Sequence, residues 1–269
     1  MIRRRLGDRF LLFTQHDHAL LAGALAARYG NARFASPEPR DETVAAVSLH
    51  DCGWPAHDEH PTLNKENLPT DVFESPIQTA VRVWAATTDR VASQTPYTQL
   101  LVSLHVLGLS GFASSHVHTR HDMFELNKFQ QREVERQESL RTRLGLSTET
   151  PLRLGLADKS NDPREERLRR GHYLLQTMDR ISLALLCTTV LFPRIDNIIP
   201  RPGAAPVGLG FSRTGDFSVK VDPWPFDRPQ LTLPIPARSV PAAPLNSEET
   251  FRRVYSDAAV EQVDVTVHS

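Results

Sequence analysis

The stretch that decides the fold is residues 47–54, VSLHDCGW, an apolar run that ends in an adjacent histidine and aspartate before a glycine. The acidic residues Asp41 and Glu42 mark a helix start and Gly53 marks its end, so we expect His50 and Asp51 in the last helical turn. Neighbouring helical residues point about 100° apart and contact one object only if it lies between them. A metal ion is such an object, whereas caps on helix-end carbonyls would be the structural alternative.

The same dipeptide occurs three more times, at His16-Asp17, His57-Asp58 and His121-Asp122. The pair at 50–51 differs from these because it closes a clearly apolar helix that would be buried on one side. We therefore place the candidate centre there.

Composition limits the function classes. The chain has 269 residues, 40% of them hydrophobic, and a formal net charge of −1, which provides no general field for nucleic acid or an anionic membrane. Cys52 and Cys187 lie in apolar helical contexts and indicate buried thiols of a reducing compartment. The apolar run 10–13 is too short for a signal segment and the run 181–192 is too short to span a bilayer. We expect a soluble, cytoplasmic protein that acts on a small molecule, and a homo-oligomer remains open.

The periodicity predicts a mainly α protein. Extended runs at 2–6 and 9–14 indicate a hairpin, and helical spacing recurs at 15–29, 74–93, 96–109, 124–144 and 163–186. The segment 55–76 between them is a loop, either a lid that binds substrate or a solvated connector. After residue 192 short alternating runs replace long helices, and half of the 20 prolines lie at or after Pro200. We therefore expect a helical domain at 1–195 and a small β-rich C-terminal appendage at 196–269, which the N-terminal hairpin could join.

Three further polar residues lie in apolar helical segments. His18 is in the first turn of the first long helix, His105 is in a middle helix, and Asp179 is inside the most apolar helix. A carboxylate in such a helix is costly unless it is paired or metal-bound, so Asp179 is the most informative of the three. His105 alone would be an ordinary core histidine.

The order of these residues resembles the HD superfamily of metal-dependent phosphohydrolases. The segments HALLA at 18–22, HDCG at 50–53 and MDRI at 178–181 look like that superfamily's first histidine, its His-Asp signature and its final aspartate. The segments 14–18, 50–54, 103–105 and 223–226 also resemble an uncharacterised bacterial family.

The HD resemblance implies an HD-like helical bundle and a divalent metal, which would be Fe, Mn, Zn, Ni or Mg. It implies His18, His50, Asp51 and Asp179 as metal ligands and His105 as a further one, with Asp51 and His105 as the catalytic residues. If a second ion is bound, Asp51 would bridge the two ions, and His116, His118 or His121 would complete the set. The expected function is hydrolysis of a phosphoester.

Two alternatives remain at this point. The same ligand set holds two irons and activates oxygen in a few HD-like proteins, which would give a di-iron oxygenase of the HD type. The other alternative is a non-catalytic helical module for ligand binding or assembly. Iron stoichiometry with a visible chromophore separates the oxygenase from the hydrolase. Absence of metal favours the module, which would bind a structural metal or none.

Overall fold

The computed structural model describes residues 1–114, 117, 119–149, 162–188 and 193–269, and its centre is one seven-stranded sheet. The strands lie in the order β1-β2-β6-β7-β5-β4-β3. All neighbouring pairs are antiparallel except β5 and β7, which are parallel. The strand bounds are β1 Ile2–Leu6, β2 Arg9–Phe13, β3 Arg194–Ile198, β4 Val207–Gly215, β5 Ser218–Asp222, β6 Gln230–Pro241 and β7 Val260–His268.

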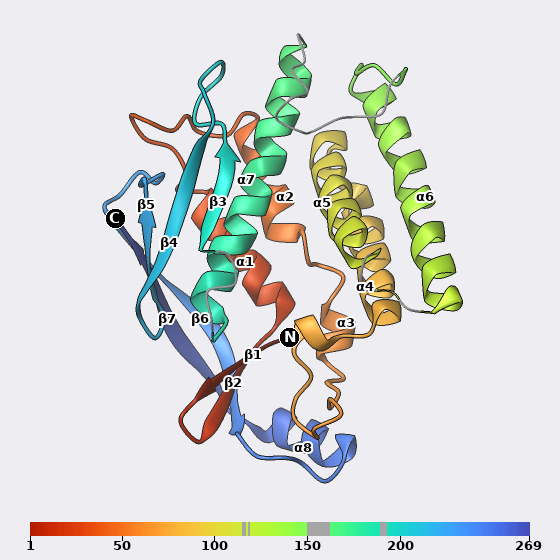
Figure 1. Ribbon diagram of the computed structural model, residues 1–269, viewed down its shortest axis with the longest axis vertical. Helices are drawn as coiled ribbons and strands as arrows, with labels where there is room; N and C mark the ends of the chain where they lie inside the picture. The colour runs from red at the N-terminus through yellow and green to blue at the C-terminus, as the bar shows by residue number, and fades with distance from the viewer. Residues whose placement is uncertain (115–116, 118, 150–161, 189–192) are drawn as a thin grey trace.

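Helices cover one side of this sheet in successive layers (Figure 1). The two inner helices, α1 (Gln15–Ala26) and α7 (Pro163–Leu186), contact the strands directly. Next come α2 (Arg40–Leu49) and α5 (Pro96–Ser114), and outermost are α4 (Ile77–Arg90) and α6 (Arg120–Arg143). Short helical segments connect these layers: α3 Pro55–Asp58, η1 Val72–Glu74 and η2 Val91–Ser93.

The expected mainly α HD-like bundle with a β-rich appendage is wrong. The protein has a mixed α/β fold in which a curled sheet forms a half-barrel. The N-terminal hairpin β1-β2 is hydrogen-bonded to β6, where Phe10 pairs with Val240, so segments from both ends of the chain lie in one sheet. Sequence periodicity identified the hairpin and a β-rich C-terminal region but carries no information about which distant strands pair, and the pairing decides the fold class.

The largest core cluster explains why the strands cannot be an appendage. It joins Phe13 of the hairpin and Val219 of β5 to Leu25 of α1 and Met178 of α7, all of them fully buried. Removing this apolar surface from water stabilises the contact between sheet and helices at about 25 cal/mol per Å². The sheet is therefore one wall of the main core.

The C-terminal end of α7 is held by two arginines from the sheet. Arg4 of β1 donates to the carbonyl oxygen of Leu185 at 2.8 Å, and Arg213 of β4 donates to those of Ala184 at 2.8 Å and Cys187 at 2.7 Å. Cationic groups at this end also complement the helix dipole. Burial and the nearby Arg213 together lower the pKa of Arg4 to about 10, and the guanidinium stays charged.

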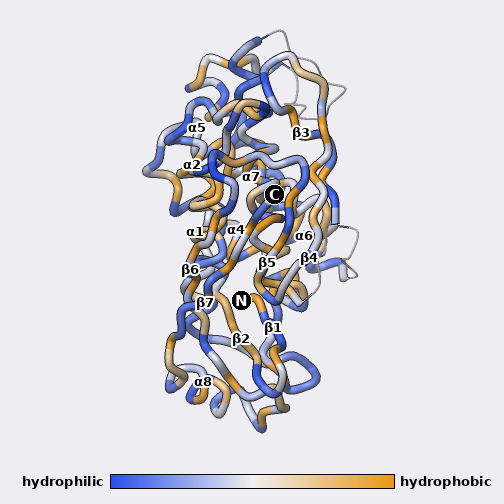
Figure 2. Tube along the Cα trace, turned by 90° about the vertical axis from the view of Figure 1, so that its left-hand side faces the viewer, coloured by the Kyte–Doolittle hydropathy of each residue, from blue (hydrophilic) through white to orange (hydrophobic). Residues whose placement is uncertain are grey.

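The last helix, α8 (Glu248–Asp257), lies at the end of the molecule next to β1 and β2, away from the helical layers (Figures 1 and 2). Its N-cap is Ser247, whose side chain accepts from the Thr250 amide, and its buried residue Phe251 packs on Phe10, Leu12 and Val240. The sheet thus has a small second core on its outer side.

Within the described part of the chain, no helix is both long and apolar enough to cross a membrane. Cys52 and Cys187 are free and buried, as the sequence predicts. The segment 55–76 is a loop interrupted by α3 and η1.

Candidate metal centre

Five side chains meet where the inner helices cross: His18 from α1, His50 and Asp51 after α2, His105 from α5 and Asp179 from α7. Oδ1 of Asp179 lies 3.0 Å from Nε2 of His18 and 3.7 Å from Nε2 of His50. Oδ2 of Asp179 lies 3.9 Å from Nε2 of His105, and Oδ2 of Asp51 lies 3.7 Å from Nε2 of His50. The structure therefore brings together all five residues proposed from the sequence.

Three of these residues form a group that could hold a metal ion. The ligand atoms of His18, His50 and Asp179 lie within 4.8 Å of one another. Neutral imidazole and carboxylate are a donor set that suits Fe, Mn, Zn and Ni. The ring of His105 extends the group, with its centroid 5.1 Å from that of His50.

The proton on His18 is placed by Ser182. The Ser182 hydroxyl donates to the backbone oxygen of Asp179 at 2.7 Å and also lies 2.9 Å from Nδ1 of His18. Because that hydroxyl has only one hydrogen, it accepts from Nδ1, and the neutral ring carries its lone pair on Nε2. That lone pair faces the Asp179 carboxylate.

A backbone carbonyl fixes the position of the proton on His50 in the same way. Nδ1 of His50 lies 2.7 Å from the carbonyl oxygen of Val47 and donates to it, which leaves the lone pair of a neutral ring on Nε2. That nitrogen is buried and has no hydrogen-bond partner among the described residues. Histidine metal ligands in proteins are commonly oriented by such a bond from the other ring nitrogen.

Two lone pairs and a carboxylate thus face one small volume, and they need a proton or a cation between them. Without an ion, burial disfavours the His50 imidazolium, but Asp51 and Asp179 outweigh burial and raise the pKa of His50 to about 9. Burial opposes ionisation of Asp179, yet contacts with His18 and His50 hold its pKa well below the usual range. The residues present therefore fit a divalent cation.

Burial is the largest influence on the pKa values of the remaining two residues, His105 and Asp51. Burial lowers the pKa of His105 to about 3, so its ring stays neutral. Burial also raises the pKa of Asp51, although His50 and His18 oppose this. Only the side chains of Asp51 and Asp179 are measurably open to solvent, at 9% and 14%, so water reaches the centre from the carboxylate side.

Two glycines allow the helices to come this close. A Cβ on Gly53 would lie 2.1 Å from the carbonyl oxygen of Val83, and one on Gly23 would lie 1.9 Å from Oγ of Ser48. The first contact holds α4 against the turn at residues 50–53. This turn follows α2, so His50 and Asp51 do not lie in the last helical turn that the sequence predicts. The second contact holds α1, which carries His18, against α2, which leads into His50.

Sequence reasoning missed Ser182, which contacts the centre, and the buried His172 on the same helix. Ser182 lies one turn beyond Asp179, and His172 lies two turns before it, so spacing of three and seven residues was the available signal. His172 is buried, its Nδ1 has no hydrogen-bond partner among the described residues, and burial lowers its pKa to about 4. In its charged form His172 would lower the pKa of His105.

The other histidines and His-Asp pairs lie elsewhere. Asp17 accepts from the Thr14 hydroxyl at 2.6 Å, Asp58 binds the Met1 amino group at 3.1 Å, and Asp122 accepts from the Thr119 hydroxyl at 2.6 Å. His121 is exposed at the start of α6. The other two histidines named for a second ion, His116 and His118, lie outside the described residues.

Residues 1–242 match the model of a family described as "Protein of unknown function (DUF3891)". The chain belongs to this family. The match runs from β1 through β6 and includes every residue of the candidate metal centre. No curated protein and no solved structure matches the chain.

Membership of this family corrects the HD resemblance. No HD-domain family matches, and the sheet between the two chain ends is not part of an all-helical bundle. The resemblance rested on short segments around single proposed ligands. Such segments are typical of any helix that places a histidine or aspartate in a buried site, so they do not identify a fold. The expectations of an HD domain and of an all-α protein are therefore both wrong.

Proposed function

We propose that the protein is a metal-dependent hydrolase of a phosphoester substrate, with His18, His50 and Asp179 as ligands of the ion. The observation that carries the proposal is the orientation of the two rings, whose Nδ1 atoms are engaged and whose Nε2 lone pairs face one carboxylate oxygen. Among the described residues this is the one group of its kind, which favours a single ion. The nitrogen donors favour Fe, Mn, Zn or Ni over Mg.

The chain's own residues would divide the work. A bound ion would lower the pKa of water and offset charge on phosphoryl oxygens. Asp51 lies 3.7 Å from His50 on the solvent-accessible side, where its carboxylate can accept a proton from water or a hydrogen bond from it. The neutral His105 ring faces the second oxygen of Asp179 and can keep that carboxylate oriented. The buried helices exclude bulk water from the imidazole side.

Elemental analysis of protein purified without a chelator or a metal affinity column tests the proposal. We expect about one transition-metal ion per chain and hydrolysis of a chromogenic phosphomonoester or phosphodiester. His50→Ala and Asp179→Asn should lose both the ion and the activity, because each removes a donor from the group.

His268→Ala is the matched control, because His268 lies at the end of β7, is only partly buried and is bonded to Thr214 rather than to a residue of the centre. Unchanged metal content in His50→Ala would contradict the ligand assignment. If no ion binds even after reconstitution, the non-catalytic module becomes the better interpretation. Metal binding without phosphoester hydrolysis would contradict the substrate class alone.

A further inference from the structure

A separate cleft lies beside the turn that follows His50 and Asp51. Its volume is about 950 Å³, within the range of small-molecule sites, and its walls come from the segment 53–76, α4 and the start of α8. Gly53 lines it, but none of the five side chains of the metal centre does. The cleft is therefore a second place where a ligand can bind.

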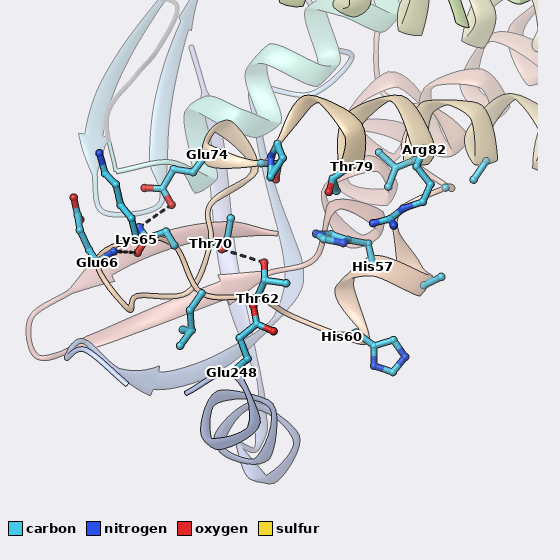
Figure 3. A pocket seen from close by; sticks show the side chains of 18 of the residues that line it. His57, His60, Thr62, Lys65, Glu66, Thr70, Glu74, Thr79, Arg82 and Glu248 are labelled. Atoms are coloured by element: carbon cyan, nitrogen blue, oxygen red, sulfur yellow. Dashed lines mark hydrogen bonds between the residues drawn. The ribbon is translucent and has the colours of Figure 1, made fainter. Parts of the chain in front are cut away.

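A cationic and a neutral basic side chain lie together at one end of the cleft. Figure 3 shows His57, Thr79 and Arg82 together at this end, with Lys65, Glu66 and Glu74 at the other. Thr79 and Arg82 are one turn apart on α4 and so lie on the same face. Arg90 lines the same wall and donates to the carbonyl oxygen of Cys52.

Two of the three carboxylates that line the cleft have partners, and the third, Glu66, lies at the end with Lys65. Glu74 accepts from Arg3 at 2.9 Å and from Asn64 at 3.1 Å, and Glu248 pairs with Arg252 at 2.6 Å. By contrast, neither Arg82 nor Lys65 has a carboxylate within ion-pair distance among the described residues. The end of the cleft at Arg82 thus carries a positive charge that no ion pair among the described residues neutralises.

The electrostatic surroundings of His57 include the same positive charge of Arg82. Its ring is half-buried and packs edge-on against Trp54, with the centroids 5.4 Å apart. Burial is the main cause of its lowered pKa, and the positive charges of the Met1 amino group and Arg82 lower it further, although Asp58 opposes them. An anion bound here would relieve that repulsion.

We propose that this cleft binds a small molecule through an oxyanion group, a phosphate or a carboxylate, held by Arg82, His57 and Thr79. Guanidinium presents paired N–H donors that match two oxygens of such a group, and the Thr79 hydroxyl and His57 ring add single hydrogen bonds. Ala56, Val83 and Ala86 supply an apolar wall for the rest of the molecule. The site requires no metal ion.

Calorimetric titration of the full chain with pyrophosphate and, separately, with citrate tests this site. We expect one of the two anions to bind, about tenfold more weakly to Arg82→Gln because charge-assisted bonds are lost. Arg228→Gln is the matched control, since Arg228 is also exposed and lies in the connection between β5 and β6. The preferred anion identifies phosphate or carboxylate as the ligand group.

His50→Ala separates this site from the metal centre and should bind the anion as tightly as the wild-type chain. In the wild-type chain, the anion should also shift the NMR signals of the His57 ring and leave those of His268 unchanged. Equal affinity of Arg82→Gln and wild type, loss of binding in His50→Ala, an unmoved His57 signal or absence of binding by both anions would each overturn the proposal.

Discussion

At the scale of single residues, the centre depends on groups that hold the rings rather than on the rings alone. Ser182 is bonded to both Nδ1 of His18 and the backbone oxygen of Asp179, so one hydroxyl connects two proposed ligands. Residues that orient metal-binding histidines in this way typically contribute 10–100-fold to metal affinity. Ser182 is therefore a positioning residue.

We predict that Ser182→Ala weakens metal binding about 10–100-fold and leaves the fold intact, because the ring of His18 loses its fixed tautomer. The measurement is competition with a chelator of known affinity. Ser256→Ala is the control, because Ser256 also donates to a carbonyl three residues earlier but contacts no histidine. Equal affinity of Ser182→Ala and wild type would remove Ser182 from the centre.

At the scale of elements, α7 connects the metal centre to the sheet. Asp179 lies within this helix, and Arg4 and Arg213 donate hydrogen bonds to carbonyl oxygens at its C-terminal end. Unsatisfied carbonyls at a buried helix end cost free energy, so these arginines stabilise α7 where it meets β1 and β4. The helix that carries Asp179 is thus anchored to the sheet at its C-terminal end.

Arg4→Met should lower the free energy of unfolding by about 1–3 kcal/mol, since it leaves buried carbonyl oxygens without donors. Urea unfolding followed by circular dichroism measures the change. Arg5→Met is the control, because the Arg5 side chain is exposed and bonds only to the Gly7 carbonyl oxygen. A smaller effect for Arg4→Met than for Arg5→Met would contradict the role of Arg4.

At the scale of the whole molecule, both ends of the chain build one sheet and its main core. Strand β6 pairs with the hairpin strand β2 on one side and with β7 on the other. The main cluster crosses residue 195, with Leu185 and Leu186 before it and Leu209 and Val219 after it. Much of the apolar face of α1 and α7 is buried only when the later strands are present.

A chain that ends at residue 195 is therefore expected not to unfold cooperatively, although the proposed helical domain would end there. It would lose strands β4 to β7 and expose the inner face of α1 and α7 to water. Thermal unfolding by calorimetry, with the full chain as reference, measures this. A cooperative transition in the shortened chain would establish 1–195 as an independent domain.

The sequence by itself determined the helices, the hairpin, the buried free cysteines and the polar residues that apolar helices carry. These follow from local periodicity, capping and the cost of burying a charge, as Asp179 illustrates. It could not determine the fold class, because the pairing of β2 with β6 and of β5 with β7 joins distant residues whose local patterns are ordinary.

Only the tertiary structure decided how the candidate residues are arranged. The close packing at Gly23 and Gly53, the bond from His18 to Ser182 and the shared carboxylate of Asp179 join segments separated by up to 164 residues. The positive cleft at His57 and Arg82 likewise forms only when α4 packs beside the turn after Asp51. Residue type supplies the chemistry, but packing of distant helices sets the distances on which binding depends.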